Sequence, residues 1–352
     1  MPPLRWTPPS RFYKSHRIIR LSNPARRWLY HHLLLGGIGA FGCYLTLRYQ
    51  CAAWEAAKRS EDGNCLCSSD MVDFLRYMPF NYMSNIAGQL AENESVPAWL
   101  HNWFVQAFVY WYAMDMSESE QKSDFDTFQQ FYMRDWRPTA RPVDAKASVV
   151  SPCDGEVLAV HTDVENTSLV QVKGLSYGMH ALFQVTPPPL KTETHRRVAV
   201  VIHMRNKDFH HVIAPLSFVC EKSVYVPGSL LPTTAAGYHW IPSVLTINER
   251  LVLQGTSSGE AELPVFMALV GSTLTGRITL YTDKRVRTNY LDPPAYAVHL
   301  PYASRPRLAR GERLATFNWG SSVVLVIDVP KSCTALKRKG DEVKAGEALL
   351  QF

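Results

Sequence analysis

Hydrophobic and polar positions divide the chain into two regions with different periodicities. Between about residues 50 and 135 apolar residues recur at helical spacing, with a loop predicted at 92–96 and a polar break at 116–123. Residues 124–134 carry a further helical period. The run Arg137-Pro-Thr-Ala-Arg-Pro142 then predicts a linker, because two prolines discourage a continuous helix.

After Ala147 the pattern changes to short β-branched runs separated by glycine and proline turns. Many short strands of this kind indicate a β-rich sandwich or barrel. Near the C-terminus Gly340 and Gly346 flank one more short strand in a predicted hairpin. The fold class predicted is therefore α+β, with helices followed by a β-rich domain over residues 143–352. Strands are expected at 148–150, 156–161, 169–172, 198–204, 212–214, 251–253, 265–270, 277–281 and 323–329.

The N-terminal segment predicts a targeting sequence followed by a membrane anchor. Residues 1–30 are rich in arginine and serine, and no acidic residue precedes Glu55, which is typical of a mitochondrial transit peptide. Residues 33–47 are uncharged and mostly apolar, and tyrosines at both ends extend them toward the length of about 20 residues that a spanning helix needs. We expect a single transmembrane segment at 31–50. The alternative is the apolar part of a secretory signal, for which the basic leader is too long.

A second stretch with membrane character covers residues 96–116. Trp99, Trp103 and Trp111 recur at multiples of four residues and are joined by further phenylalanines and tyrosines. Such a stripe is either core packing or an interfacial helix, since tryptophan and tyrosine favour the membrane surface. Both readings stay open, and residues 51–142 are expected to form a helical, membrane-associated region.

Charge and cysteine content narrow the function classes. The formal net charge of +6 comes from the N-terminal segment, so the basic balance indicates targeting and does not predict nucleic-acid binding. The seven cysteines are scattered, and Cys65-Leu-Cys67 is too tight for a zinc hairpin. We expect free thiols and no metal site.

Three short motifs carry candidate chemistry: Asp154-Gly155, Asp208-Phe-His210-His211 and Gly320-Ser321. Asp-Gly and Gly-Ser pairs are ordinary turns when taken singly. A serine after glycine, however, can attack the preceding carbonyl and convert the amide into an ester, provided that a positioned base takes its proton. Elimination from that ester and hydrolysis leave a pyruvoyl group made from the chain itself.

These motifs and several longer segments, in the same order, resemble the self-cleaving phosphatidylserine decarboxylases over about residues 76–352. The matching segments are Val96-Pro-Ala-Trp-Leu100, Phe131–Val143, Ser151-Pro-Cys-Asp-Gly155, Val226-Pro-Gly-Ser-Leu230, Asn248-Glu-Arg-Leu-Val-Leu253, Val270-Gly-Ser-Thr-Leu-Thr-Gly276 and Gly311–Ser322. The resemblance implies cleavage between Gly320 and Ser321, a long chain ending at Gly320, and a short chain beginning with the pyruvoyl group derived from Ser321.

The same resemblance implies a substrate and roles for the site residues. Phosphatidylserine, a membrane phospholipid, would form a Schiff base with the Ser321-derived pyruvoyl group and lose carbon dioxide to give phosphatidylethanolamine. Asp154 belongs to the family's processing triad, and His210 is the candidate for handling protons. The location implied is the mitochondrial inner membrane, and the oligomeric state, a homodimer included, stays open.

One departure from the family pattern bears on activity. The family has Asp-Tyr-His-x-x-His-x-Pro, and its second histidine completes the triad, whereas Ile213 stands at that position here. His211 would share a strand face with Ile213, about 6–7 Å away along the strand, and is the second candidate base; alternatively His210 serves both steps. The predicted catalytic set is therefore Asp154, His210, His211 and Ser321.

Three other readings compete. A relative that no longer processes itself would act as a membrane-bound lipid-binding or assembly protein, as Ile213 favours. The C-terminal hairpin resembles a biotinyl or lipoyl module but lacks the target lysine. A pyruvoyl decarboxylase for a soluble amino acid is disfavoured by the membrane segments.

Overall fold

The computed structural model describes Cys67 and residues 69–352, apart from short gaps at 122, 163, 165–167, 173–174, 186, 191–192, 260–261, 274–276, 291 and 319–321. All described residues belong to one compact unit, Ala53–Phe352. The predicted transit peptide at 1–30, the predicted span at 31–50, and Trp319, Gly320 and Ser321 lie outside the described residues. Among those that are described, no helix has the length and apolar character needed to cross a membrane.

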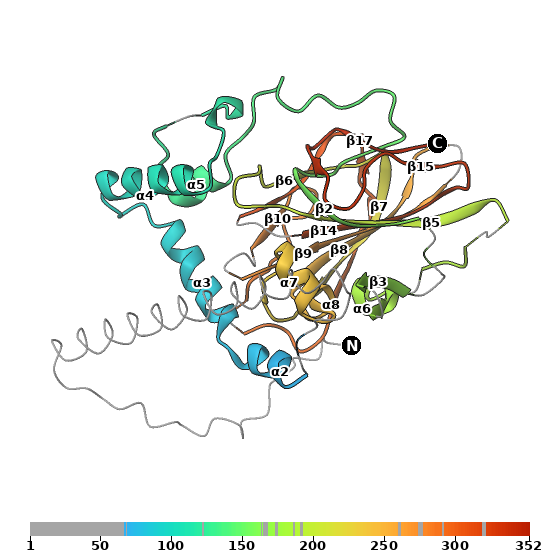
Figure 1. Ribbon diagram of the computed structural model, residues 1–352, viewed down its shortest axis with the longest axis horizontal. Helices are drawn as coiled ribbons and strands as arrows, with labels where there is room; N and C mark the ends of the chain where they lie inside the picture. The colour runs from blue at the N-terminus through green and yellow to red at the C-terminus, as the bar shows by residue number, and fades with distance from the viewer. Residues whose placement is uncertain are drawn as a thin grey trace, which may run out of the picture. The chain divides into compact units, whose positions relative to one another are not determined.

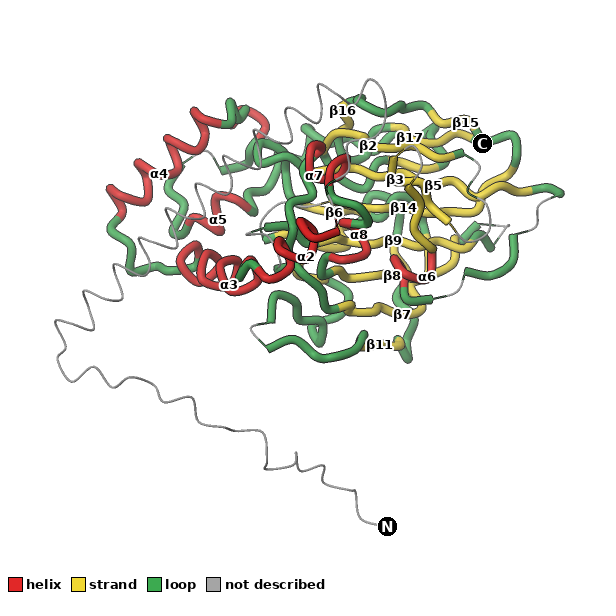
Figure 2. The backbone as a smooth tube through the Cα atoms, turned by 60° about the horizontal axis from the view of Figure 1, so that its bottom comes forward, coloured by secondary structure: helices red, strands yellow, loops and turns green. Residues whose placement is uncertain are grey.

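Helices occupy the first part of the described chain, as the periodicity predicts. They are α2 (Ser69–Tyr77), α3 (Phe80–Ala91), α4 (Ala98–Trp111), the 3-10 turn η2 (Met116–Glu118) and α5 (Phe128–Tyr132). The loop predicted at 92–96 separates α3 from α4, and the described residues of the polar break at 116–123 include the 3-10 turn η2. Figures 1 and 2 show α3, α4 and α5 gathered beside the strands.

Helix α4 has aromatic side chains on two faces, one packed in the core and the other exposed. Phe108 packs edge-on against Phe128 and Phe131, with ring centroids 5.3 and 6.0 Å apart, and so joins the small core under α5. Trp99 and Trp103 lie on the other side, with 73% and 64% of their surface exposed. Aromatic residues are therefore both core and surface in this helix.

The rest of the described chain is β-rich, which confirms the α+β class. Three short helices interrupt it: α6 (Met179–Phe183), α7 (Ala235–Trp240) and α8 (Val244–Ile247). The strands are β1 (Val149–Val150), β2 (Gly155–His161), β3 (Ser168–Val172), β4 (Leu175–Gly178), β5 (His195–His203), β6 (His211–Ile213), β7 (Phe218–Val226), β8 (Arg250–Ser257), β9 (Pro264–Val270), β10 (Ile278–Leu280), β11 (Val298–Pro301), β12 (Arg307–Leu308), β13 (Arg313–Phe317), β14 (Ser322–Pro330), β15 (Thr334–Ala335), β16 (Glu342–Val343) and β17 (Ala348–Gln351).

A nine-stranded antiparallel sheet forms the centre of this region. Its order is β11-β7-β8-β9-β14-β5-β2-β16, and β12 pairs separately with β7. Two three-stranded sheets, β10-β13-β6 and β1-β17-β15, share one hydrophobic core with it. Every pairing among these strands is antiparallel, and the β-rich domain predicted from the short β-branched runs is confirmed.

Strand β14 owes its central position to its uninterrupted apolar run. Every residue from Ser322 to Val329 is buried, so both faces of the strand are covered. Asp328, the one charge in the strand, is also buried because Arg197 on β5 donates to both of its oxygens, at 2.6 and 2.8 Å. The strand that follows Ser321 is therefore rigidly held between β5 and β9.

Candidate active site

Asp154 is buried at the turn that leads into β2. Only 3% of its surface is exposed, and its carboxylate accepts hydrogen bonds from Arg141 Nε at 2.8 Å and Arg141 Nη2 at 2.5 Å. The backbone N–H of Ala345 donates a further bond at 2.8 Å. A buried carboxylate needs such partners because leaving water is costly for a charge. The turn predicted at Asp154-Gly155 is thus an anchored, charged site.

Only glycine fits at position 155, because β5 leaves no space for a side chain there. Its φ of 156° is accompanied by very close packing against β5, so that an added Cβ would lie 2.4 Å from the His203 carbonyl oxygen and 2.8 Å from Ile202 Cγ2. Backbone cannot move aside as a flexible side chain can. The glycine therefore holds Asp154 directly beside the end of β5.

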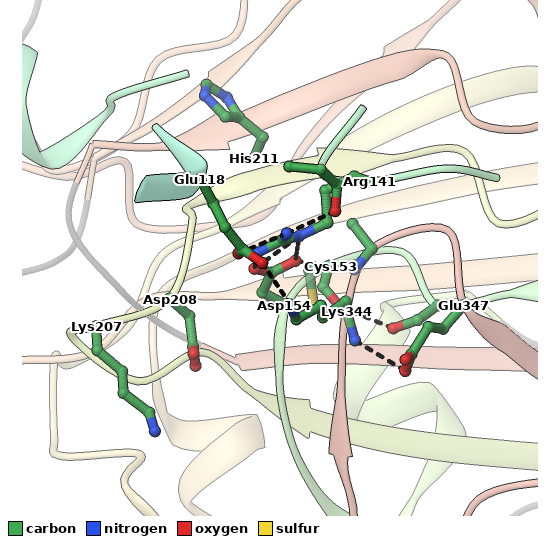
Figure 3. Close-up of polar contacts among 12 residues, drawn as sticks. Glu118, Arg141, Cys153, Asp154, Lys207, Asp208, His211, Lys344 and Glu347 are labelled. Atoms are coloured by element: carbon green, nitrogen blue, oxygen red, sulfur yellow. Dashed lines mark hydrogen bonds and ion pairs between the residues drawn. The ribbon is translucent and has the colours of Figure 1, made fainter. Parts of the chain in front are cut away.

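Arg141 connects Asp154 to the helical region. Its Nη1 donates to Glu118 Oε2 at 2.8 Å, and Glu118 also accepts from Lys344 Nζ at 2.6 Å (Figure 3). Burial lowers the pKa of Arg141, but hydrogen bonding and attraction to Asp154 outweigh it and leave the pKa raised. The segment predicted as a linker thus contains a buried side chain that positions the site, and sequence reasoning missed this residue.

His210 is completely buried next to the aromatic ring of Tyr132. The two ring centroids are 4.2 Å apart. Burial, and secondarily the nearby cation Arg134, lowers the pKa of His210 well below its usual range, so the imidazole is neutral at neutral pH. Its backbone carbonyl accepts a hydrogen bond from the N–H of Phe317 at 2.9 Å. His210 is thereby fixed beside the strand that precedes Gly320.

His211 is buried as well, but its ring is engaged elsewhere. Nδ1 lies 2.8 Å from Thr316 Oγ1, and Nε2 lies 2.9 Å from Asp135 Oδ1. Figure 3 shows the ring directed away from the Arg141–Asp154 pair. Hydrogen bonding from His211 and then from Arg313 lowers the pKa of Asp135 to about 2. The structure thus joins His211 to an ionised carboxylate and not to Asp154.

Ile213, at the position of the family's second histidine, lies against the turn that carries Asp154. Its N–H donates to the Pro152 carbonyl at 2.8 Å, and its side chain is buried. The predicted strand at 212–214 exists, as β6 (His211–Ile213). The segments that contain Asp154 and His210, 56 residues apart in sequence numbering, are therefore neighbours in space.

The two described flanks of the predicted cleavage pair lie at this same place. On one side β13 ends at Phe317, next to His210. On the other side Ser322 begins β14, paired with His203 of β5 and Val270 of β9. Ser322 Oγ lies 3.4 Å from His203 Nδ1 and donates to the Thr233 carbonyl, also at 3.4 Å.

His203 is a second residue that sequence reasoning missed. It is the last residue of β5, and 9% of its surface is exposed. Burial, followed by the charge of Arg205, lowers its pKa to about 4, so this imidazole is neutral at neutral pH too. In the sequence His203 stands near the end of an apolar run. The only feature that could have drawn attention to it is that histidine is unusual in such a run.

Two cations close to the site, Arg205 and Lys207, are already paired. Arg205 donates to Asp208 from its backbone N–H, Nε and Nη2, and it also pairs with Glu342. Lys207 lies 3.7 Å from Glu342. These ion pairs hold the turn before His210 closed. A lipid phosphate would have to displace the carboxylates in order to bind Arg205 or Lys207.

Cysteines and metal-ligating groups do not form a centre in the described part of the chain. Cys67, Cys153, Cys220 and Cys333 are free thiols. Burial raises the pKa of Cys153, beside Asp154, well above its usual value, so this thiol is un-ionised. No group of three histidine, cysteine or acidic side chains among the described residues is arranged to hold a metal ion.

Comparison with known proteins agrees with this arrangement. A family model described as phosphatidylserine decarboxylase matches residues 128–351. The chain belongs to the phosphatidylserine decarboxylase family. It is 28% identical to the mitochondrial phosphatidylserine decarboxylase proenzyme of Cricetulus griseus, over 81% of this chain and 75% of the relative.

Other relatives come from animals and bacteria. The mitochondrial phosphatidylserine decarboxylase proenzyme of Caenorhabditis elegans is 29% identical, over 78% of this chain and 71% of its own length. The phosphatidylserine decarboxylase proenzyme of Idiomarina loihiensis is 31% identical, over 72% and 85% respectively. The resemblance predicted from the motifs is confirmed, and with it the assignment of the chain to a decarboxylase family.

Proposed function

We propose that this chain decarboxylates phosphatidylserine to phosphatidylethanolamine after cutting itself between Gly320 and Ser321. The observations that support the proposal are contacts between the segments concerned. The Ile213 N–H bonds to the Pro152 carbonyl, the Phe317 N–H bonds to the His210 carbonyl, and β5 pairs both with Ser322 and with the start of β2, directly after Asp154. Family membership supplies the reaction class, and the word proenzyme in the relatives' names agrees with self-processing.

The buried groups next to Ser322 suit a pyruvoyl group at position 321. Thr233 Oγ1 is buried and has no hydrogen-bond partner among the described residues, while the Thr233 carbonyl accepts from Ser322. A buried hydroxyl without a partner is costly, and a carbonyl group close by would satisfy it. When formed, the pyruvoyl group supplies a ketone that withdraws electrons from the substrate as carbon dioxide leaves.

In this proposal His210 moves the substrate's proton. Phosphatidylserine carries an ammonium group, which must lose a proton before its nitrogen can react. The neutral imidazole of His210 accepts a proton and can return it to the substrate carbon after decarboxylation. Its complete burial excludes bulk water, which would otherwise supply protons without control.

The helical region brings the site to its lipid substrate. Exposed aromatic side chains gather on α3 and α4, where aromatic surface favours the membrane interface. We assign residues 1–30 to a mitochondrial transit peptide, 31–50 to a span in the inner membrane, 51–142 to membrane association and 143–352 to catalysis. The exposed set on the two helices is Tyr82, Leu90, Trp99, Leu100, Trp103, Phe104, Tyr110 and Trp111.

The proposal is tested by release of carbon dioxide from carboxyl-labelled phosphatidylserine in mixed micelles. The purified chain should release it, and Ser321→Ala should not. Free serine and O-phosphoserine should not be consumed, whereas their decarboxylation would favour a soluble substrate. A purified chain that is cut at Ser321 and yet inert toward phosphatidylserine would overturn the proposed reaction.

The competing function is a membrane-bound lipid-binding or assembly protein that does not process itself. Ile213 is the observation that favours it, since an alkyl side chain cannot accept a proton. An uncut chain that binds phosphatidylserine vesicles without turnover would support this alternative.

A further inference from the structure

Arg134 is a buried cation without a carboxylate partner in the described part of the chain. Only 3% of its surface is exposed, although its chain neighbours Met133 and Asp135 are partly exposed. Its Nη2 donates to the Lys207 carbonyl at 2.9 Å, whereas Nε and Nη1 have no acceptor among the described residues. Burial lowers the pKa of Arg134 to about 10, so the side chain is charged at neutral pH. A buried charge without a counter-ion is destabilising, and a bound anion would relieve that cost.

The neighbouring arginines differ from Arg134 because their charges are compensated. Arg141 donates to Asp154 at 2.8 Å, and Arg205 donates to Asp208 at 2.9 Å. These two carboxylates attract Arg134 only from a distance and raise its pKa less than burial lowers it. An anion that binds Arg205 has to displace a carboxylate, whereas an anion that binds Arg134 does not.

Aromatic rings hold the guanidinium of Arg134 in place. Its central carbon lies 4.7 Å from the centroid of the Phe209 ring and 5.6 Å from that of Phe131. Stacking on rings uses the faces of the planar guanidinium and leaves the N–H groups at its edge able to donate. The free N–H groups at Nε and Nη1 therefore suit the oxygens of an anion, with which they would form charge-assisted hydrogen bonds.

His210 lies close to Arg134, and its ring also lacks hydrogen-bond partners. Phe209, which stacks on Arg134, directly precedes His210, and the charge of Arg134 contributes to the lowered pKa of His210. Neither ring nitrogen of His210 has a hydrogen-bond partner among the described residues. One group is a cation that donates, and the other is a neutral imidazole that can accept. A ligand with both an anionic group and an ammonium group is complementary to this pair.

We propose that Arg134 binds the phosphate of the lipid head group. This inference rests on the proposed function, in which His210 takes a proton from the ammonium group of phosphatidylserine. That head group contains two anions, a carboxylate and a phosphate. A cation bound to the carboxylate would stabilise the charge that is lost as carbon dioxide leaves, and so would slow the reaction. The phosphate keeps its charge throughout, so binding it holds the substrate without opposing decarboxylation.

The test measures binding of sn-glycero-3-phosphoethanolamine, a soluble head group with a phosphate and no carboxylate, by isothermal titration calorimetry. The parent is the full-length chain with Ser321→Ala in detergent micelles, which excludes cutting and turnover. Adding Arg134→Met should weaken binding at least about tenfold, as loss of a charge-assisted hydrogen bond does. Arg134→Lys keeps the charge but not the planar donors, and should bind more weakly than the parent and more tightly than Arg134→Met. Arg76→Met on exposed α2 is the matched control and should bind as the parent does.

Two further readouts distinguish a phosphate site from other roles of Arg134. Arg134→Met should not melt below the parent, because it removes a buried charge that has no carboxylate partner. A large fall in melting temperature would show that the folded protein already compensates this charge, and would count against the inference. sn-Glycerol 3-phosphate should displace the probe and acetate should not. Displacement by acetate alone would assign Arg134 to the carboxylate and refute the phosphate site.

The binding assay and the release of carbon dioxide fail independently of each other. Probe binding by Arg134→Met within about threefold of the parent would refute the role of Arg134, as would a parent that does not bind the probe. In both cases carbon dioxide release by the unaltered chain still decides the proposed function. Binding that depends on Arg134, in a chain that releases no carbon dioxide from phosphatidylserine, would refute the proposed function and support the phosphate site.

Discussion

Replacing Arg141 by methionine tests the claim that this residue holds Asp154 in place. The substitution keeps an unbranched side chain but removes every hydrogen bond from the guanidinium to Asp154 and Glu118. Glu118 keeps its pair with Lys344, whereas Asp154 keeps only the backbone N–H of Ala345. The main effect therefore falls on Asp154.

The size of the effect follows from burial. Only 4% of either side chain in the Arg141–Asp154 pair is exposed. Removal of one partner from such a pair leaves a buried charge and costs about 3–5 kcal/mol. The ion pair between Arg76 and Asp73 has exposed fractions of 56% and 66% and lies at 3.9 Å, so its loss should cost less than about 0.5 kcal/mol.

The assay is urea unfolding of the full-length chain in detergent, followed by tryptophan fluorescence. All variants carry Ser321→Ala, so that self-cleavage does not mix species. Arg141→Met should lower the free energy of unfolding by about 3–5 kcal/mol, and Arg76→Met should leave it almost unchanged. In the double variant with Asp154→Asn the losses should fall short of additivity by about 2 kcal/mol, because the unpaired charge is gone. A loss below about 1 kcal/mol for Arg141→Met would refute the reasoning.

Three further predictions concern other parts of the chain. Burial raises the pKa of Glu249 from 4.5 to about 8, so between pH 4.5 and about 8 the folded state holds a proton that the unfolded state releases. The free energy of unfolding should therefore fall by about 1.4 kcal/mol for each pH unit of increase across this window. Glu249→Gln should make the free energy of unfolding less dependent on pH there, and an unchanged slope would contradict the prediction. Gly155→Ala should lower stability by more than about 2 kcal/mol and slow self-cleavage, because its Cβ meets the His203 carbonyl at 2.4 Å; normal melting and cutting would contradict this. Trp99→Ser with Trp103→Ser should weaken co-sedimentation with phosphatidylserine vesicles several-fold without changing the melting temperature, and undiminished binding would remove α4 from the membrane surface.

The sequence predicts the apolar strands well because their β-branched runs are continuous. All nine predicted strand positions contain a strand, β14 among them. Strand β7 (Phe218–Val226) was not predicted, since Glu221 and Lys222 interrupt its apolar pattern. Its identity as a strand comes from pairing with β8 and β11, which no local pattern records.

The site shows the same division between local and long-range information. Asp154 and His210 are recognisable because they stand in motifs of fixed spacing. Arg141 and His203 are not, because each is placed by contacts across the fold: Arg141 lies against the Asp154 carboxylate, and His203 lies opposite Ser322 in the strand register. A change of register by one residue would turn the His203 side chain to the other face of the sheet.

The measurement that tests the central claim most directly is the intact mass of the purified full-length chain, beside the Ser321→Ala variant. The account predicts two fragments from the unaltered chain: one ending at Gly320, and one spanning residues 321–352 with a pyruvoyl group in place of its first residue. The variant should give a single uncut mass. A single uncut mass from both chains, even after prolonged incubation with phosphatidylserine, would contradict the account.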